Sequence, residues 1–245
     1  MDDGIDISTS AETNAHCSKS VYTSISLTHV QYTKGDFIGF VLAWSSLVPF
    51  CLLVAFVTLI VFRRDIHTIS YFVGLLLNEA VNWILKHTIR EQRPSRDISV
   101  LFTEYGMPSS HSQFMYFFAT YLVFFLLIRV YRNYNWMDDL WKYALIVGGY
   151  LCATLVAYSR VYLGYHTGSQ VIWGGVVGLV LGCVWFAFVQ AILTPFFPYL
   201  AGSRPGELLM LRDSTLIPHV LWFEYTSSRS EARNRQRKLT SRKSQ

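Results

Sequence analysis

The sequence predicts an all-α fold, a polytopic membrane bundle with about five transmembrane helices, and two observations lead to it. Of the 245 residues, 52% are hydrophobic and only 15% are charged, a balance too apolar for a typical soluble domain. The apolar residues are concentrated in five separate segments, each close to the roughly 20 residues with which a helix crosses ~30 Å of hydrocarbon. A bundle of membrane-spanning helices accounts for both observations.

The five apolar segments divide the chain into three regions. In chain order they lie at residues 37–62, 68–86, 111–129, 140–158 and 171–193. We expect a polar N-terminal segment at residues 1–36, a membrane domain at residues 37–194, and an interfacial and basic tail at residues 195–245. The first 32 residues are rich in Ser and Thr and lack the pattern of a cleavable signal peptide, so the later segments are expected to direct insertion.

Five spans place the two termini on opposite sides of the membrane, so the loops can be sorted by charge. One side receives Arg63 and Arg64, then Arg129, and then the tail, where nine of the 21 Lys and Arg residues lie beyond residue 195. By the positive-inside rule this side, with the C-terminus, is cytosolic. The other side receives the loop at residues 87–110 and the connector at residues 159–170. Basic residues on that second side need another explanation, and binding of an anionic ligand supplies one.

The tail beyond Pro195 is polar apart from one apolar patch at residues 208–211, which is too short to span a membrane. We expect this patch to lie at the interface or to pack on the bundle. The net charge of +5 does not require a nucleic-acid partner, because a basic tail beside anionic lipid accounts for it.

The last apolar segment carries a stripe of glycines, at Gly174, Gly175, Gly178 and Gly182. Small residues at this spacing allow a neighbouring helix to approach closely. We favour packing within the chain over a dimer seam, and the sequence leaves the oligomeric state open.

The second span has a polar face, because Glu79, Asn82 and Lys86 are spaced at i, i+3 and i+7. An ionisable residue near mid-membrane costs on the order of 2.5–3.5 kcal/mol, so Glu79 is expected to face the interior of the bundle. A structural hydrogen bond and a role in supporting a site are both open for Glu79. Lys86 either extends to the membrane interface or contributes to the same site.

Cations from two separate stretches are expected at the non-cytosolic surface. Lys86 ends the second span, and Arg93 follows seven residues later, just before Pro94, which ends any helix. Arg160 ends the fourth span, and His166 lies just before the fifth. The three cations and the histidine are therefore predicted to lie near one another.

The third span opens with Pro108-Ser109-Ser110-His111. A helix N-terminus offers unpaired N–H groups and a favourable dipole to an anion, and serine hydroxyls add donors. His111 at this position is either a plain interfacial residue or a source of a proton for a leaving group.

These residue types fit phosphoryl transfer, which requires cations and donors around three non-bridging oxygens, a nucleophile in line, and an acid on the opposite side. The positive charge can come from Lys86, Arg93 and Arg160. The hydrogen-bond donors can come from Ser109 and Ser110, and the nucleophile and the acid from His111 and His166. The four cysteines are scattered, and no Asp, His and Cys cluster has metal-ligand spacing. A mechanism without metal or other cofactor is therefore favoured.

The three stretches resemble the signature motifs of the type 2 phosphatidic acid phosphatase superfamily, which shares its helical fold with vanadium haloperoxidases. In order, they are Lys86-x6-Arg93-Pro94, Pro108-Ser109-Ser110-His111 and Ser159-Arg160-x5-His166. The resemblance implies that His166 is the nucleophile and forms a phosphohistidine, that His111 is the general acid, and that no metal takes part. It implies that the phosphate binders are Lys86, Arg93, Ser109, Ser110 and Arg160.

Two positions depart from the superfamily pattern. Ser110 replaces a glycine, and it still offers a backbone N–H. Gln170 stands where an aspartate usually orients the nucleophilic histidine. A glutamine carbonyl can accept the imidazole N–H and fix the tautomer, but it lacks the charge that stabilises an imidazolium.

The residues around the motifs, at 78–83, 106–115 and 159–171, resemble more narrowly the branch of the superfamily that acts on dolichyl diphosphate, where a glutamine at this place is expected. This resemblance implies a multi-pass enzyme of the endoplasmic reticulum membrane. It further implies that the substrate is a polyisoprenoid diphosphate lipid, hydrolysed on the lumenal face to dolichyl phosphate and phosphate. The product supports recycling of the lipid carrier for protein N-glycosylation.

Two alternatives remain open from the sequence. The chain is a phosphatase for another lipid phosphate, such as phosphatidate or a sphingoid phosphate, or it is a catalytically silent protein that binds or transports polyprenyl phosphates. Gln170 is the main support for the silent protein.

Overall fold

The computed structural model describes residues 22–25, 30–94, 105–130, 140–215, 217 and 220–243, where nearly all regular structure is helical. The long helices are α3 (Val48–Arg63), α4 (Ile66–Ile89), α6 (Ser110–Phe124), α7 (Leu140–Tyr162), α8 (Gly168–Phe188) and α11 (Val220–Lys243). The shorter elements are the antiparallel strands β1 (Tyr22–Ile25) and β2 (Val30–Thr33), the helices α2 (Phe37–Ser45), α9 (Phe197–Ala201) and α10 (Arg204–Leu208), the π-helical turns η1 (Phe125–Arg129) and η3 (Val189–Leu193), and the 3-10 turn η4 (Thr194–Phe196).

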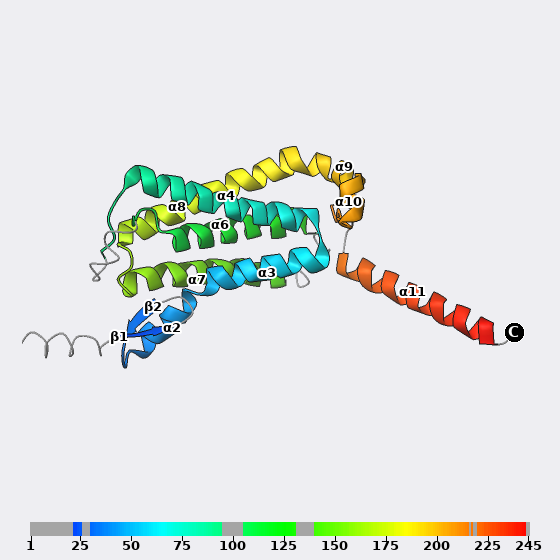
Figure 1. Cartoon of the computed structure of the whole chain (residues 1–245), viewed down its shortest axis with the longest axis horizontal. Coiled ribbons are helices and arrows are strands. Elements are labelled where there is room, and N and C mark those ends of the chain that lie inside the picture. Colours follow the sequence, from blue (N-terminus) through cyan, green and yellow to red (C-terminus); the bar gives the residue numbers. More distant parts are fainter. Residues whose placement is uncertain are drawn as a thin grey trace, which may run out of the picture.

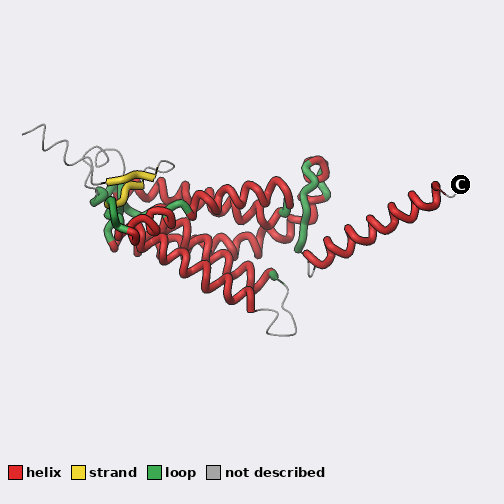
Figure 2. Tube along the Cα trace, turned by 90° about the horizontal axis from the view of Figure 1, so that it is seen from below, coloured by secondary structure: helices red, strands yellow, loops and turns green. Residues whose placement is uncertain are grey.

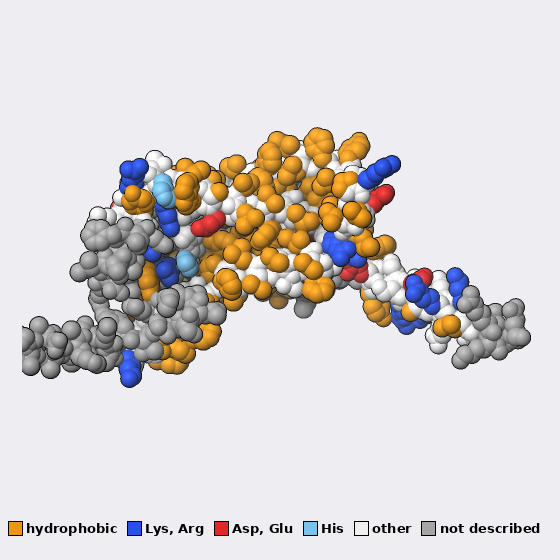
Figure 3. All heavy atoms as spheres, in the orientation of Figure 1, with side chains coloured by type: hydrophobic (Ala, Val, Ile, Leu, Met, Phe, Trp, Pro, Cys, Tyr) orange, Lys and Arg blue, Asp and Glu red, His pale blue; other side chains and the backbone are white. Residues whose placement is uncertain are grey.

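Within the described residues, five helical runs are long and apolar enough to cross a membrane. They are Phe37–Arg63, Ile66–Ile89, Ser110–Arg129, Leu140–Tyr162 and Gly168–Ala201. The helices α3, α4, α6, α7 and α8 run side by side along a common direction (Figures 1 and 2). Apolar side chains cover the middle of the bundle, and charged side chains gather toward its two ends (Figure 3). The predicted all-α membrane bundle with five spans is confirmed.

The first span is broken at Ser46 and Leu47, between α2 and α3, where the sequence predicts one continuous segment. Pro49 lies in the first turn of α3, a position that suits proline because the N–H it lacks has no helical partner there. α2 packs against α7. The break brings the Ser46 hydroxyl to 3.3 Å from Nη1 of Arg160. This hydroxyl therefore accepts a hydrogen bond from one of the predicted phosphate-binding residues.

The fifth span is longer than predicted, because the helical path continues past Pro195 to Ala201. Pro195 and Pro198 each lie in the first turn of a new helical segment, η4 and α9 respectively. In the first turn of a helix a missing N–H removes no helical bond, so these prolines continue the chain's course rather than end it.

α6 is the central helix of the bundle and packs against α8, α7 and α4. Its Phe117 and Tyr121 are almost wholly buried, in a core cluster with Tyr71 and Leu75 of α4 and Phe186 of α8. The rings of Tyr71 and Tyr121 stack with their centroids 4.0 Å apart. Because α6 is packed on several sides, the position of its N-terminus is fixed by the bundle.

The glycine stripe of α8 faces α6. A Cβ atom added to Gly174 would lie 2.6 Å from the carbonyl oxygen of Ser109, and one added to Gly178 would overlap the carbonyl oxygen of Gln113. At Gly182, an added Cβ would lie 3.0 Å from the Cβ of Thr120. The stripe therefore allows close packing of two helices of the same chain, as the sequence analysis favoured.

Gly178→Ala is expected to destabilise the bundle by about 1–3 kcal/mol, the usual cost of overpacking, because the added methyl group meets backbone that cannot rotate away. Thermal unfolding of the purified protein in detergent measures the effect. Gly148→Ala in α7 is the matched control, since nothing lies within 4 Å of its added Cβ. Equal melting temperatures for the two variants would contradict the expectation.

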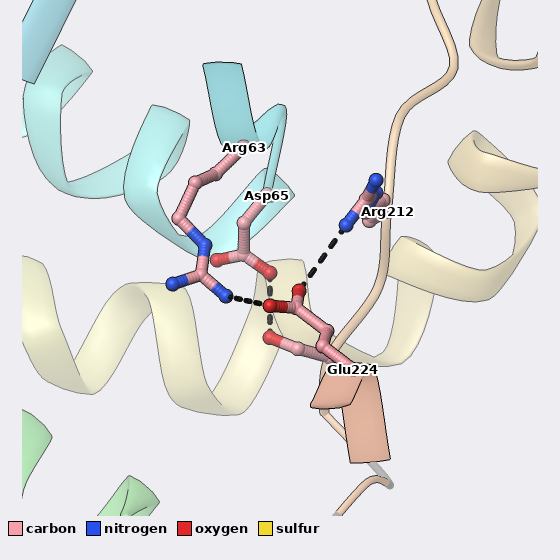
Figure 4. Close-up of polar contacts among 5 residues, drawn as sticks. Arg63, Asp65, Arg212 and Glu224 are labelled. Carbon is pink, nitrogen blue, oxygen red and sulfur yellow. Dashed lines mark hydrogen bonds and ion pairs between the residues drawn. The ribbon is translucent and has the colours of Figure 1, made fainter. Parts of the chain in front are cut away.

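The tail is tied to the bundle through Glu224 near the start of α11 (Figure 4). Its carboxylate accepts from Nη2 of Arg63 at 2.7 Å and from Nη1 of Arg212 at 3.2 Å, and nearby the Ser214 hydroxyl donates to Asp65. Partly exposed ion pairs are worth roughly 0–1 kcal/mol each, so the set of contacts, more than any one of them, holds the tail. The helical character of residues 220–243 is not predicted by the sequence analysis.

The apolar patch at the start of the tail is divided between the surface and the bundle. Leu208, Leu209 and Met210 are exposed, whereas Leu211 packs against the buried cluster that includes Ile66. Leu211 thus packs on the bundle, which is one of the two arrangements that the sequence predicts for the patch.

Candidate functional site

One end of the bundle, opposite to α11, brings the three polar stretches of the sequence together. α4 and α7 end there, and α6 and α8 begin there (Figure 1). His166 lies within electrostatic range of Arg160, Arg93 and Lys86. His111 lies within range of the same three cations and of His166. The predicted convergence of cations and histidines is therefore present in the fold.

The N-terminus of α6 presents donors to this site. Ser109 is the N-cap, Ser110 is the first helical residue, and both Ser110 and His111 are half-buried. Ser109 is wholly buried, and its N–H donates to the Gln170 carbonyl oxygen at 3.1 Å. Its hydroxyl has no hydrogen-bond partner among the described residues, which is rare for a buried polar group. Together with the helix dipole, this hydroxyl is suited to bind a phosphate oxygen.

Arg160 is a buried cation, with only 6% of its surface exposed. Its Nη1 donates to the Ser46 hydroxyl, its guanidinium lies 4.3 Å from the centre of the Tyr165 ring, and its Nε has no partner within the described residues. Among the residues that the structure describes, no carboxylate is paired with Arg160. A buried charge without a counter-ion is costly, so an anionic ligand is the partner that this geometry favours.

His166 lies between α7 and α8 and is 3% exposed. Burial, followed by the positive charges of Arg160 and Arg93, lowers the pKa of His166 to about 3, while its hydrogen bond to Gln170 acts in the opposite direction. The imidazole is therefore neutral at pH 7. Its Nδ1 lies 3.1 Å from Oε1 of Gln170. Because an amide oxygen only accepts, Nδ1 carries the proton and Nε2 has a free lone pair.

Gln170 is wholly buried, and both ends of its amide are engaged. Besides His166, its Oε1 accepts from the N–H of Thr167 at 3.3 Å, completing a capping box at the start of α8. Its Nε2 donates to Oε1 of Glu91 at 2.8 Å and to the carbonyl oxygen of Gln92 at 3.0 Å. Glu91 plays no part in the sequence analysis. Its only sequence signal is an acidic residue between Arg90 and Arg93.

The loop after α4 folds back against the segment before α6. Gln92 and Tyr105 form an isolated antiparallel bridge, and Nε of Arg93 donates to the Tyr105 carbonyl oxygen at 3.4 Å. The N–H of Gly106 donates to the Glu91 carbonyl oxygen at 2.7 Å. These backbone contacts hold Arg93 at the edge of the site.

A network of buried amides connects α4 to α6 beneath the site. Nδ2 of Asn82 donates to Oε1 of Gln113 at 2.8 Å and to the Pro108 carbonyl oxygen at 3.3 Å. Nε2 of Gln113 donates to the carbonyl oxygen and to Oδ1 of Asn78, at 2.9 and 3.0 Å. Asn82 therefore supports the Pro108 turn, and Asn78 and Gln113 are supporting residues that sequence reasoning missed.

The expectation that Glu79 faces the interior of the bundle is wrong. Glu79 is exposed on the outer face of α4, within electrostatic range of Lys86, which is half-buried. The buried stripe passes instead through Asn78 and Asn82, at i and i+4. At about 100° per residue, Glu79 and Asn82 lie about 60° apart around the helix axis. Asn82 can therefore point into the bundle while Glu79, at the edge of the same face, points outward.

No metal-ligand group of three His, Cys, Asp or Glu side chains is found in the portion of the chain that the structure describes. In the described part of the chain, the polar groups near His166 are cations, amides, hydroxyls and the carboxylate of Glu91. This donor set is suited to holding an oxyanion.

Comparison with known proteins places this geometry among lipid phosphatases. Residues 67–193 match the model of a family described as the PAP2 superfamily. The chain is 53% identical over 218 residues to Dolichyldiphosphatase 1 of Rhinolophus ferrumequinum and 52% identical to that of Homo sapiens; each alignment covers 88% of this chain and 92% of the relative. It is 39% identical to Lipid phosphate phosphatase gamma of Arabidopsis thaliana, over 84% of this chain and 91% of the relative.

A solved structure has the same fold. The crystal structure of a transmembrane PAP2-type phosphatidylglycerolphosphate phosphatase from Bacillus subtilis aligns with a TM-score of 0.53 and 20% sequence identity. The alignment covers 77% of this chain and 90% of the bacterial one. At this identity the likeness concerns the arrangement of helices.

Proposed function

The chain belongs to the PAP2 superfamily and is a membrane lipid phosphatase, and from this premise we propose that it hydrolyses dolichyl diphosphate to dolichyl phosphate and phosphate. The observation that carries the proposal is the buried site in which neutral His166 lies among Lys86, Arg93 and Arg160. Relatives more than 50% identical over most of the chain, named for action on dolichyl diphosphate, support the choice of substrate.

In the proposed mechanism the terminal phosphate lies between the two histidines. Nε2 of His166 attacks the terminal phosphorus, and the bond from phosphorus to the bridging oxygen breaks. His111 donates a proton to that oxygen, and dolichyl phosphate leaves. Water, deprotonated by His111, then attacks the phosphohistidine and releases phosphate.

The remaining site residues stabilise charge on the three non-bridging oxygens. Lys86, Arg93 and Arg160 supply positive charge, and the Ser109 hydroxyl and the N–H groups at Ser110 supply hydrogen bonds. Preorganised charges and donors of this kind would leave little reorganisation to accompany the reaction.

We further propose that the site lies on the lumenal face of the endoplasmic reticulum membrane and that the C-terminus is cytosolic. The support is the distribution of charge: Arg63, Arg129 and the basic α11 lie at the end of the bundle opposite to His166. A lumenal site would return the lipid carrier to use in protein N-glycosylation.

A phosphatase for another lipid phosphate is the second candidate function, favoured by the similarity to Lipid phosphate phosphatase gamma. Release of phosphate by the purified protein from dolichyl diphosphate, phosphatidate and a sphingoid phosphate distinguishes the two. We expect kcat/KM to be highest for dolichyl diphosphate. A higher value for a monoester would replace the proposed substrate, and no release from any of the three would favour a catalytically silent binding protein.

Phosphate release is expected to be unchanged in EDTA, because the proposed mechanism draws its positive charge from Lys86, Arg93 and Arg160. The measurement is the initial rate with and without chelator, with added Mg²⁺ as the third condition. Complete loss in EDTA with recovery in Mg²⁺ would contradict a metal-independent mechanism.

A further inference from the structure

Glu91 lies directly behind the residue that orients the nucleophilic histidine. Its Oε1 accepts from Nε2 of Gln170 at 2.8 Å, and Oε1 of Gln170 lies 3.1 Å from Nδ1 of His166. The three side chains form one continuous chain of hydrogen bonds that ends at the imidazole. Glu91 is one of the six unspecified positions between Lys86 and Arg93 in the first sequence motif.

A buried glutamine can present either end of its amide, and only one end is useful to His166. If the amide were turned over, its NH₂ group would face Nδ1, and the imidazole would carry its proton on Nε2, the atom that has to attack phosphorus. Glu91 and the Gln92 carbonyl oxygen are both acceptors, so they require the NH₂ group on their side. The tautomer of His166 is thus set, through Gln170, by the Glu91 carboxylate and the Gln92 carbonyl oxygen, which do not contact the imidazole themselves.

Glu91 also supplies a negative charge that Gln170 lacks. When Nε2 of His166 bonds to phosphorus, the imidazole becomes a cation, and an adjacent carboxylate stabilises it. Gln170 cannot do this alone. A carboxylate hydrogen-bonded to the far side of the amide polarises the Gln170 carbonyl toward Nδ1 and conveys part of the effect.

The fold around Gln170 has room for the amide in this orientation. A Cβ at Gly106 would lie 2.8 Å from Nε2 and 2.9 Å from Oε1 of Gln170, so a side chain there would displace the amide. The Gly106 N–H also holds the Glu91 carbonyl oxygen at 2.7 Å. One glycine therefore both makes space for Gln170 and fixes the backbone of Glu91.

We propose that Glu91 is a positioning residue for the proposed phosphatase reaction, acting through Gln170 to set the tautomer of His166 and to stabilise the phosphohistidine. In this chain the pair Gln170 and Glu91 does what a single aspartate does at the corresponding place elsewhere in the superfamily. The proposal rests on the proposed function in one respect, that His166 is the nucleophile.

The first test compares Glu91→Ala and Glu91→Gln in the full-length purified protein. Glu91→Ala removes the acceptor and the charge, and kcat is expected to fall by about 10- to 100-fold, the range seen when the hydrogen-bond partner behind a metal-binding histidine is removed. KM is expected to stay within about threefold, because Glu91 does not touch the substrate. Glu91→Gln keeps an acceptor and removes the charge, and is expected to lose less.

The matched control is Asp36→Asn, which removes a carboxylate near the same end of the bundle. Asp36 accepts from the exposed Tyr162 hydroxyl and, among the described residues, has no hydrogen bond to a residue of the site. Its kcat and KM are expected to equal those of the wild type. Thermal unfolding of each variant shows whether a lower rate comes from loss of folded protein.

The second test exchanges the two groups. Gln170→Glu alone brings two carboxylates within hydrogen-bond distance and is expected to be strongly impaired. The double variant Glu91→Gln with Gln170→Glu restores one carboxylate and one amide, with the carboxylate now facing His166. Its rate of phosphohistidine formation, measured by rapid quench with ³²P-labelled substrate, is expected to exceed that of Gln170→Glu by at least about tenfold, a coupling that purely structural, additive effects do not produce.

The outcomes separate this proposal from the proposed function. If the wild type releases phosphate and forms a phosphohistidine while Glu91→Ala has the same kcat, Glu91 is not a positioning residue and the proposed function stands. If the exchange variant is no faster than Gln170→Glu, the orienting role is also overturned. If the wild type itself forms no phosphohistidine, the proposed mechanism fails whatever the effect of Glu91.

Discussion

His166→Ala is expected to reduce phosphate release on the order of 10⁶-fold, as removal of a hydrolase nucleophile does. In the proposed mechanism the free lone pair of the neutral imidazole attacks phosphorus, and the cations, amides and hydroxyls described around it attack far less readily. The measurement is phosphate release from dolichyl diphosphate, together with trapping of ³²P on the protein. Both signals are expected to disappear in the variant.

The variant is expected to remain folded, because its one lost side-chain hydrogen bond, to Gln170, is worth about 0.5–1.5 kcal/mol. His87→Ala is the matched control, since His87 is an exposed histidine near the same end of the bundle and is expected to be dispensable. A His166→Ala protein with activity within tenfold of the wild type would remove His166 as the nucleophile.

His111→Ala is expected to slow phosphohistidine formation by about 10²- to 10⁴-fold, the range for loss of a general acid. His111 lies in the first turn of α6, within electrostatic range of His166, so the substrate's leaving oxygen can lie between them. Rapid-quench measurement of the phosphorylated protein isolates this step from later hydrolysis by water.

The leaving group distinguishes an acid from a residue that only shapes the site. An aryl phosphate made from an acidic phenol releases a phenolate that needs no proton. The rate of its cleavage is therefore expected to fall much less in His111→Ala than the rate for dolichyl diphosphate. Equal losses for the two substrates would contradict the assignment of His111 as the acid.

Much of the fold follows from the sequence because hydrophobic length and small-residue spacing are local signals. The five spans and the packing of Gly174 and Gly178 on α6 are of this kind. Proline is a less certain signal. Pro49 breaks the first span where one helix is predicted, whereas Pro195 does not end the fifth, because its effect depends on whether a new helical turn begins at that residue.

The candidate site was predictable in its cations and histidines and not in the groups that orient them. Glu79 was misplaced because spacing defines a helical face without saying which way that face points. Glu91 was missed because it meets Gln170 only after the loop folds back on Gly106, a contact between residues distant in sequence. Local patterns do not contain contacts of this kind.

The close packing of α8 on α6 also sets the spacing of the two histidines. His111 and His166 belong to the starts of these two helices, and at that level the Ser109 N–H is bonded to the Gln170 carbonyl while Gly174 leaves no room for a side chain. In the proposed mechanism phosphorus lies between the two imidazoles, and the spacing of the histidines is then fixed by the contact between the two helix backbones. Enlarging Gly174 would change that spacing, whereas enlarging Gly182, two turns deeper, would alter melting temperature with far less effect on the spacing of the histidines.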